Sequence, residues 1–280
     1  MIDSEATPCP GGQTDQFDFQ DIERQVRSII DDEKNGRARE AGHPTIFHTL
    51  INSDMPDNEK TFSRLTYEGL TLIGAGTVTT AHVLTRTVFY VLSDPPVLER
   101  LRQELRGVFS DGPELSAKET LIQLDQLPYF GAVIKEGLRL AHAITHRNAR
   151  VAPDRALRFQ EWIIPPAAAV SMTAFLVHMD PAIYPEPDRF QPERWLDIPN
   201  SPGAKSLDKY LLPYNRGSRI CLGMNLADAE LKLTLAAIFH GYELTLFETT
   251  RDDVEVVHDF ISGCARQDSK GVRVTIRPRK

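Results

Sequence analysis

Apolar positions recur at helical spacing along much of this 280-residue chain. In residues 19–39 the isoleucine and valine side chains fall on one face of a helix. Residues 64–94 predict a long and largely apolar helix, which ends at Asp94-Pro95-Pro96 because proline cannot continue a helix. The helices expected from this pattern are residues 19–39, 45–53, 64–94, 97–109, 128–144 and 224–242.

The pattern changes after Arg147, where short β-prone runs are separated by prolines. Residues 156–180 predict small strands and a hairpin, and a proline-rich meander follows up to residue 205. Alternating positions then predict edge strands over residues 242–248, 254–258 and 272–278. We therefore expect a mainly α fold with a small β portion, in which residues 1–20 form a loose leader and residues 21–280 one domain.

Composition narrows the class of protein. A hydrophobic share of 41% and a charged share of 25% are typical of a globular chain, and the net charge of −7 argues against nucleic acid as a partner. The three cysteines are too few for a disulfide framework, and no Cys/His spacing indicates zinc. The acidic N-terminus does not resemble a signal peptide, and no run reaches the roughly 20 apolar residues of a membrane span.

One stretch matches part of a dinucleotide-binding loop. Gly74, Gly76 and Thr79 follow an apolar run at the spacing of Gly-x-Gly-x-x-Gly. The third glycine is absent, and no acidic residue follows about 20 positions later to bind a ribose. The other interpretation is a core helix with small residues where a neighbour packs closely. An NAD(P)-dependent oxidoreductase therefore stays a weaker alternative.

Two further groups of charged residues can have a structural or a functional role. Glu136 and Arg139 stand three residues apart, on one face of a predicted helix. Arg194 lies in the proline-fixed meander beside Trp195. Taken singly, these are an exposed helix pair and an ordinary turn.

The segment around Cys221 carries a stronger signal. Gly217 and Gly223 let the backbone fold tightly around the sulfur, and a predicted helix N-terminus follows directly. Backbone amides and a helix N-terminus stabilise a thiolate, and Arg219 can pair with an external carboxylate. This chemistry suits a haem iron whose propionates need a cationic partner. A buried, inert cysteine would explain the sulfur but leaves the glycines and the arginine unexplained.

With these residues in place, the sequence resembles the cytochrome P450 family. Four motifs stand in the family's order, namely AGTVTT, EGLR, FQPERW and YNRGSRICLG, with Tyr214 at the usual phenylalanine position. The resemblance covers the chain from about Asp21 to the C-terminus. In its general sequence character, the chain is most similar to fungal enzymes of secondary metabolism. The resemblance implies the cytochrome P450 fold without its N-terminal part.

The resemblance also implies roles for individual residues. Cys221 would be the proximal thiolate ligand of a haem b, which Arg219 and one of Arg147 or Arg150 would contact through its propionates. Thr79, with Thr80 beside it, would deliver protons to bound dioxygen. Ala75 and Gly76 would leave room for dioxygen. Gly217, Gly223 and Tyr214 would lie around the haem. Glu136, Arg139 and Arg194 would form a structural charge triad.

The sequence departs from the family in several places. Val78 replaces the acid that usually precedes the distal threonine, so protons must pass through Thr79, Thr80, water or a substrate group. Ala149 and Ala167 stand where the family favours proline and glycine. The resemblance also implies a missing N-terminal half, which would hold the membrane anchor and the roof of the substrate channel. A full-length relative would lie at the endoplasmic reticulum membrane, whereas this chain without an anchor would be cytoplasmic.

These observations favour a haem-thiolate monooxygenase that inserts one oxygen atom of dioxygen into a small lipophilic substrate. Its electrons would come from NADPH through NADPH-cytochrome P450 reductase, and the missing N-terminal half is a further candidate partner. The alternative that stays open is a truncated, non-catalytic haem-binding remnant.

Overall fold

The computed structural model describes residues 19–35, 45–109, 116–196 and 207–279. These residues fall into two compact units, with a boundary between Val78 and Thr79. The smaller unit belongs to residues 12–78, and the larger unit contains residues 79–280. The predicted leader, residues 1–20, lies almost wholly outside the described residues.

The smaller unit is built from three helical segments. They are α1 (Phe19–Lys34), α2 (Ile46–Ile51) and the first part of α3 (Phe62–Ser93). A small apolar core forms where Ile22, Val26 and Leu65 are buried together. Gly69 permits this contact, because a Cβ at that position would lie 2.9 Å from Cγ2 of Ile22.

The larger unit contains the rest of α3 and most of the remaining predicted helices. Asp94 begins α4 (Pro95–Arg106) by accepting a hydrogen bond from the Val97 amide, with prolines in the first turn. Ser116 and Glu119 form a capping box for α5 (Ala117–Leu124), which the pattern did not predict. Two longer helices of this part are α6 (Pro128–Ala141) and α8 (Met224–Gly241).

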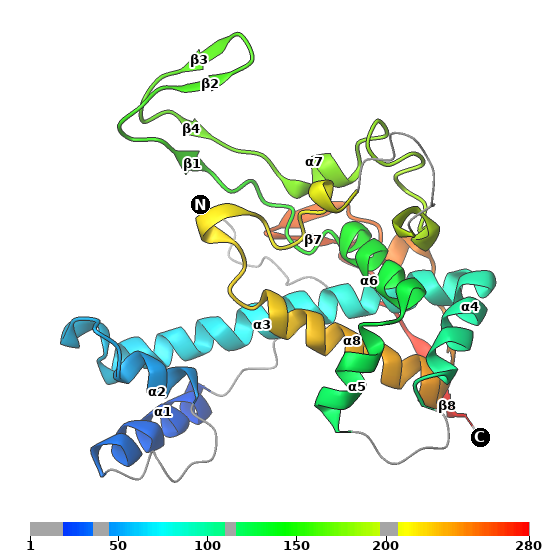
Figure 1. Ribbon diagram of the computed structural model, residues 1–280, viewed down its shortest axis with the longest axis horizontal. Coiled ribbons are helices and arrows are strands. Elements are labelled where there is room, and N and C mark those ends of the chain that lie inside the picture. The colour runs from blue at the N-terminus through cyan, green and yellow to red at the C-terminus, as the bar shows by residue number, and fades with distance from the viewer. Residues whose placement is uncertain (1–18, 36–44, 110–115, 197–206, 280) are drawn as a thin grey trace. The chain divides into compact units, whose positions relative to one another are not determined.

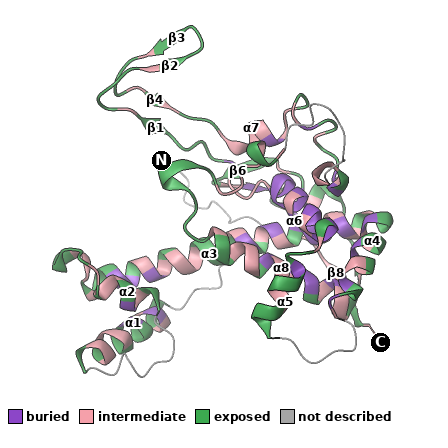
Figure 2. Ribbon diagram, viewed as in Figure 1, coloured by how far each residue is buried: buried purple, intermediate pink, exposed green. Residues whose placement is uncertain are grey.

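Helix α6 forms the centre of the larger unit. Leu127 gives it no side-chain cap, and Glu104 of α4 instead accepts the amides of Tyr129 at 3.0 Å and Phe130 at 2.7 Å. Figure 2 shows α6 as largely buried, and its apolar side chains share a core with α3, α4 and α8. Helix α3 comes close to α6 at Gly137, where a Cβ would lie 2.2 Å from Oγ1 of Thr87.

The described strands form four antiparallel pairs. β1 (Arg150–Val151) pairs with β4 (Ala169–Val170), and β2 (Leu157–Phe159) pairs with β3 (Trp162–Ile164) as the arm at the top of Figure 1. β5 (Tyr242–Leu246) pairs with β8 (Val274–Pro278), and β6 (His258–Phe260) pairs with β7 (Ser262–Cys264). A mainly α fold with a small β portion is thus confirmed.

Two local predictions are wrong. Residues 174–178, which were expected to be β-prone, form the short helix α7 (Ala174–His178), because Thr173 caps it by accepting the Phe175 amide. Residues 254–257 are not a strand, since Val254 turns into the core and β6 begins only at His258. Ala167 has a φ of 63°, the left-handed conformation in which glycine would be unstrained.

Candidate functional site

The segment from Tyr214 to Gly223 forms a tight loop directly before α8. Asn215 and Gly217 take left-handed backbone conformations, with φ values of 62° and 80°. These turns bring the Cys221 amide back to the Tyr214 carbonyl oxygen, to which it donates a hydrogen bond at 2.9 Å. The loop therefore holds the Cys221 backbone in place while leaving its thiol exposed.

Residues close to Cys221 in the sequence carry exposed apolar and basic side chains. The exposed fractions are 44% for Ile220, 83% for Leu222 and 62% for Leu226, which are high for large aliphatic side chains. Arg219 is exposed as well. A Cβ added at Gly217 or Gly223 would meet no atom within 4 Å, so the surface beside the sulfur is open.

Tyr214 anchors the start of the loop from the core side. Its side chain packs against the main apolar core, and its hydroxyl is buried. Burial, together with the negative charge of Asp228, raises the pKa of Tyr214 to about 12. Tyr214 is therefore an aromatic residue packed on the core, with a neutral phenol.

The structure brings the predicted charge triad together. Glu136 and Arg139 both have fully buried side chains, and Arg139 donates to both carboxylate oxygens, at 2.8 Å and 2.9 Å. Arg194 donates from Nε to Glu136 Oε1 at 3.0 Å. Trp195 joins these three residues as a fourth member of the cluster, since its indole N–H donates to Glu136 Oε2 at 2.8 Å.

The same cluster fixes the proline-rich meander. Arg139 Nη1 donates to the carbonyl oxygens of His178 at 2.8 Å and Pro187 at 2.7 Å. Its Nη2 donates to the carbonyl oxygen of Arg189 at 3.2 Å. The buried charges of Glu136 and Arg139 are therefore paired with each other and hydrogen-bonded to neighbouring groups. This is the condition under which a protein core tolerates charge. The roles of Trp195 and His178 were not predicted from the sequence.

The predicted distal residues lie on α3 but are divided between the units. Thr79 and Thr80 belong to the larger unit, whereas Ala75 and Gly76 belong to the smaller one. Oγ1 of Thr80 is buried and has no hydrogen-bond partner among the described residues. It does not bond back to the preceding helical turn, as Thr87 does through the Val83 carbonyl oxygen at 2.8 Å.

The dinucleotide-loop hypothesis is wrong. Gly74, Gly76 and Thr79 all lie inside the continuous helix α3. A dinucleotide loop needs a strand, a tight turn and a helix N-terminus at which the pyrophosphate binds. None of these elements occurs at Gly74 or Gly76, so their spacing reflects a helix with small residues.

The two candidate propionate-binding arginines follow α6. His142 ends that helix in a left-handed conformation, with a φ of 49°. Arg147 is exposed, and Arg150 is exposed on β1 with Nη1 donating to the Ala149 carbonyl oxygen at 3.1 Å. Both guanidinium groups are therefore accessible to an external carboxylate.

Three histidines of the larger unit have pKa values far below the ordinary value for histidine. Burial, with the nearby Arg86, lowers the pKa of His82 to about 3. Burial, with the neighbouring His178, lowers the pKa of His142 to about 3. Burial, with the Arg139 charge, lowers the pKa of His178 to about 4. All three are neutral in the folded chain at neutral pH.

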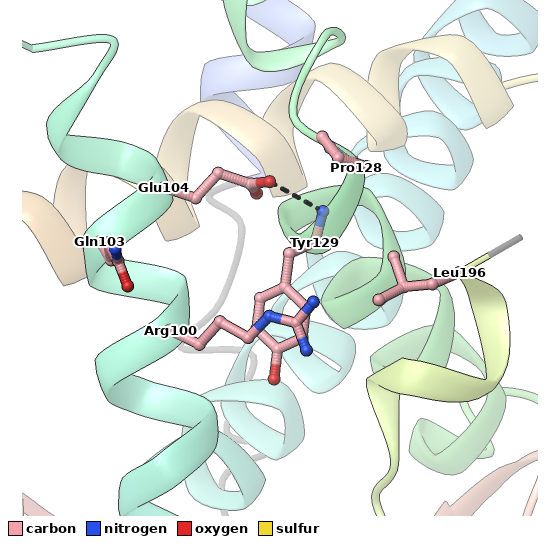
Figure 3. Close-up of a pocket in the computed structure, with 6 residues that line it drawn as sticks. All are labelled: Arg100, Gln103, Glu104, Pro128, Tyr129 and Leu196. Carbon is pink, nitrogen blue, oxygen red and sulfur yellow. Dashed lines mark hydrogen bonds between the residues drawn. The ribbon is translucent and has the colours of Figure 1, made fainter. Parts of the chain in front are cut away.

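A separate pocket of about 300 Å³ lies between α4 and α6. In Figure 3 the Arg100 guanidinium covers the Tyr129 ring, 4.1 Å from its centroid. Glu104 at the pocket wall already accepts hydrogen bonds from the Tyr129 and Phe130 amides, so its carboxylate caps the start of α6. The pocket contains none of the predicted site residues.

Two kinds of feature are absent from the described residues. These residues contain no group of three or more His, Cys, Asp or Glu side chains placed to hold a metal ion. They also contain no helix with the length and apolar character needed to cross a membrane.

Comparison with known proteins identifies the family. The model of the family described as cytochrome P450 matches residues 10–261. The cytochrome P450 monooxygenase sdnE of Sordaria araneosa is 39% identical over 91% of this chain and 51% of its own length. The N-acetyltryptophan 6-hydroxylase ivoC of Emericella nidulans is 40% identical over 84% of this chain and 45% of its own.

The solved structure of retinoic acid-bound cyanobacterial CYP120A1 has a similar fold. It matches with a TM-score of 0.69 and 25% identity, over 93% of this chain and 55% of that structure. The chain therefore spans about half the length of the curated relatives it matches. The sequence match, the shared fold and the loop around Cys221 together show that this chain belongs to the cytochrome P450 family.

Proposed function

We propose that this chain is the haem-ligand-bearing part of a haem-thiolate monooxygenase. The observation that carries the proposal is the loop from Tyr214 to Gly223, which presents an exposed thiol at the start of α8 on a backbone fixed by a hydrogen bond. Such a loop holds one sulfur accurately toward a ligand and leaves its donor orbital accessible. Membership in the cytochrome P450 family makes a haem with a thiolate-ligated iron the expected ligand.

The residues around the thiol fit a haem b. A porphyrin is a broad apolar plane with two carboxylates at one edge, and Ile220, Leu222 and Leu226 offer exposed apolar surface beside Cys221. Arg219, Arg147 and Arg150 offer exposed guanidinium groups for the carboxylates. Gly217 and Gly223 keep the surface near the sulfur free of side chains.

The bound haem would activate dioxygen for insertion of one oxygen atom into a substrate. This chain would supply the thiolate from Cys221 and hydroxyl groups from Thr79 and Thr80 to hold and move protons. The buried Thr80 hydroxyl has no partner among the described residues, so it is available for such a hydrogen bond. Because Val78 supplies no acid, protons would pass from hydroxyl to hydroxyl or through water.

Family membership supports a proposal for the class of substrate and for the electron donor. We infer a small lipophilic substrate of fungal secondary metabolism, with electrons delivered from NADPH by a cytochrome P450 reductase at the endoplasmic reticulum membrane. Two relatives are named for hydroxylation of an indole ring, N-acetyltryptophan 6-hydroxylase and tryptophan 6-hydroxylase. An indole-containing substrate is therefore the first class to test.

A second candidate is a non-catalytic haem-binding remnant. It would keep the same thiol loop and bind haem there, and it differs from the first candidate in forming no product.

Haem content and product formation, measured together, separate these candidates. The chain would be purified with haem supplied, alone and with the preceding half of a fungal relative fused to its N-terminus. A monooxygenase predicts one haem per fused chain and product formation with NADPH and reductase. A remnant predicts haem without product in both forms, and haem in neither form contradicts both candidates.

A further inference from the structure

A buried imidazole joins the charge cluster to the loop that carries Cys221. His178 is the last residue of α7 and is 2% exposed. Its Nε2 accepts a hydrogen bond from the Leu212 amide at 2.9 Å. On the other side, its carbonyl oxygen accepts from Arg139 Nη1 at 2.8 Å, and the Arg139 backbone hydrogen-bonds to the ring.

From Leu212 the path to the thiol is short and runs through backbone. The Leu212 carbonyl oxygen accepts the Asn215 amide at 3.2 Å, and the Tyr214 carbonyl oxygen accepts the Cys221 amide at 2.9 Å. Every residue from Asn215 to Gly223 is exposed, so the loop gains little support from side-chain burial. Its entry segment must therefore be held from the core side.

The imidazole is suited to this task only when it is neutral. A protonated ring has N–H donors on both nitrogens and cannot accept the Leu212 amide. Burial and the Arg139 charge keep the ring in its neutral form. Because Nε2 accepts the Leu212 amide, the neutral ring carries its proton at Nδ1.

We propose that His178 is a positioning residue for the Cys221 loop, linking the Glu136–Arg139 cluster to the Leu212 amide. It sets where the thiol points without touching any reacting atom. The proposal rests on the proposed function for its meaning in haem ligation, but the mechanical link itself does not require haem. A small shift at Leu212 would be passed through Tyr214 to Cys221, because consecutive backbone hydrogen bonds connect them.

The test uses amide hydrogen exchange of the purified full chain. His178→Leu removes the acceptor, and we expect the Leu212 and Cys221 amides to exchange about tenfold faster, since the half-buried Leu212 amide loses its partner. His178→Gln can place its amide oxygen near the position of Nε2, and we expect exchange close to that of the unmodified chain. His178→Asn places its amide near Nδ1 instead, so it should behave like His178→Leu.

Tyr184→Phe is the matched control. Tyr184 packs on His178 with ring centroids 6.4 Å apart, and its buried hydroxyl has no partner among the described residues. Removing that hydroxyl disturbs the same packing without touching Leu212, so loop exchange should not change. The proposal is overturned if His178→Leu leaves the loop protected, if Tyr184→Phe exposes it equally, or if His178→Gln fails to rescue it.

A second readout connects the link to the ligand. In chain loaded with haem and reduced under carbon monoxide, His178→Leu should lower the fraction of thiolate-ligated spectrum and His178→Gln should restore it. If no variant binds haem at all, the proposed function fails while the exchange result still decides the role of His178. If haem binds normally and exchange is unchanged, the link fails while the proposed function stands.

Discussion

At the residue scale, the larger unit depends on one buried carboxylate. Glu136 accepts hydrogen bonds from Arg139, Arg194 and Trp195, and also from the Gln191 amide at 3.0 Å. A buried charge of this kind contributes little net energy while it is paired, but it leaves expensive unpaired groups when its partner is removed. Glu136 therefore ties α6 to the meander rather than acting in chemistry.

Replacing Glu136 with Gln tests that view. The change keeps the size of the side chain but leaves Arg139 buried without a counter-charge, so the free energy of unfolding should fall by about 3–5 kcal/mol. Urea unfolding followed by circular dichroism measures it. The matched control is Lys135→Ala on the same helix, which removes the exposed Lys135–Asp208 pair and should cost at most about 1 kcal/mol. Equal losses in the two variants would contradict the account.

Ala167 offers a change in the opposite direction. Its left-handed backbone, with a φ of 63°, costs a residue with a Cβ about 1 kcal/mol more than glycine. Ala167→Gly should therefore raise the free energy of unfolding by up to about 1 kcal/mol, read from the shift of the urea midpoint. The neighbouring Ala168 has no positive φ, so Ala168→Gly should lower stability. Stabilisation by both variants would show that strain is not the cause.

At the element scale, α6 is placed by contacts that act along its length. Glu104 of α4 satisfies its first amides, and Gly137 allows Thr87 of α3 to pack against its middle. These contacts orient Glu136 and Arg139 toward the meander. The proposed site therefore depends on helix packing as well as on the loop itself.

Alanine substitutions at two glycines of α6 distinguish the effect of packing on stability from the effect of helix propensity. A Cβ at Gly137 would lie 2.2 Å from Thr87 Oγ1, whereas a Cβ at Gly131 would meet nothing within 4 Å. Gly137→Ala should destabilise the chain by about 1–3 kcal/mol through overpacking. Gly131→Ala should stabilise it by up to about 1 kcal/mol, because alanine favours the helix. The midpoints of thermal unfolding should move in opposite directions, and a shift of the same sign in both would contradict this packing.

Element prediction from the sequence succeeded where the pattern was long. The apolar period over residues 64–94 and 224–242 indicated α3 and α8 correctly, because many turns repeat the same face. It failed for α7, whose five residues are too few to show a helical period, and for residues 254–257, where Val254 packs into the core outside any strand. Short elements are decided by caps and tertiary contacts.

At the scale of the whole molecule, the candidate site was predicted only in part. The Cys221 loop and the pairing of Glu136 with Arg139 followed from motifs in the sequence. The link through His178 did not, because a single histidine at the end of a short helix gives no sign of its distant partner Leu212. The unpartnered Thr80 hydroxyl was also hidden, since threonines in helices commonly bond back to the preceding turn.

Stability of the larger unit should depend on pH through its buried histidines. The folded-state pKa values are about 3 for His82, about 3 for His142 and about 4 for His178, all below the ordinary 6.5. The unfolded chain therefore binds more protons below pH 6.5, and the stability from these groups is fully present above that pH. It is lost as the pH falls toward about 4, by up to about 1.4 kcal/mol per histidine for each pH unit.

Urea midpoints between pH 7 and pH 4 check this prediction. The midpoint should fall steadily over that range, and His82→Gln should make the fall shallower because one proton fewer is taken up on unfolding. A midpoint that stays level from pH 7 to pH 5 would contradict the burial of these rings.

The central claim is that the sulfur of Cys221 is the axial ligand of a haem. The most direct measurement is the spectrum of the haem-loaded, reduced protein under carbon monoxide, for the chain fused to a preceding half and for the same protein carrying Cys221→Ser. We predict that the fused protein gives the red-shifted band from which the family takes its name and that Cys221→Ser abolishes it. The same band at full height in the serine variant would show that the thiolate comes from elsewhere.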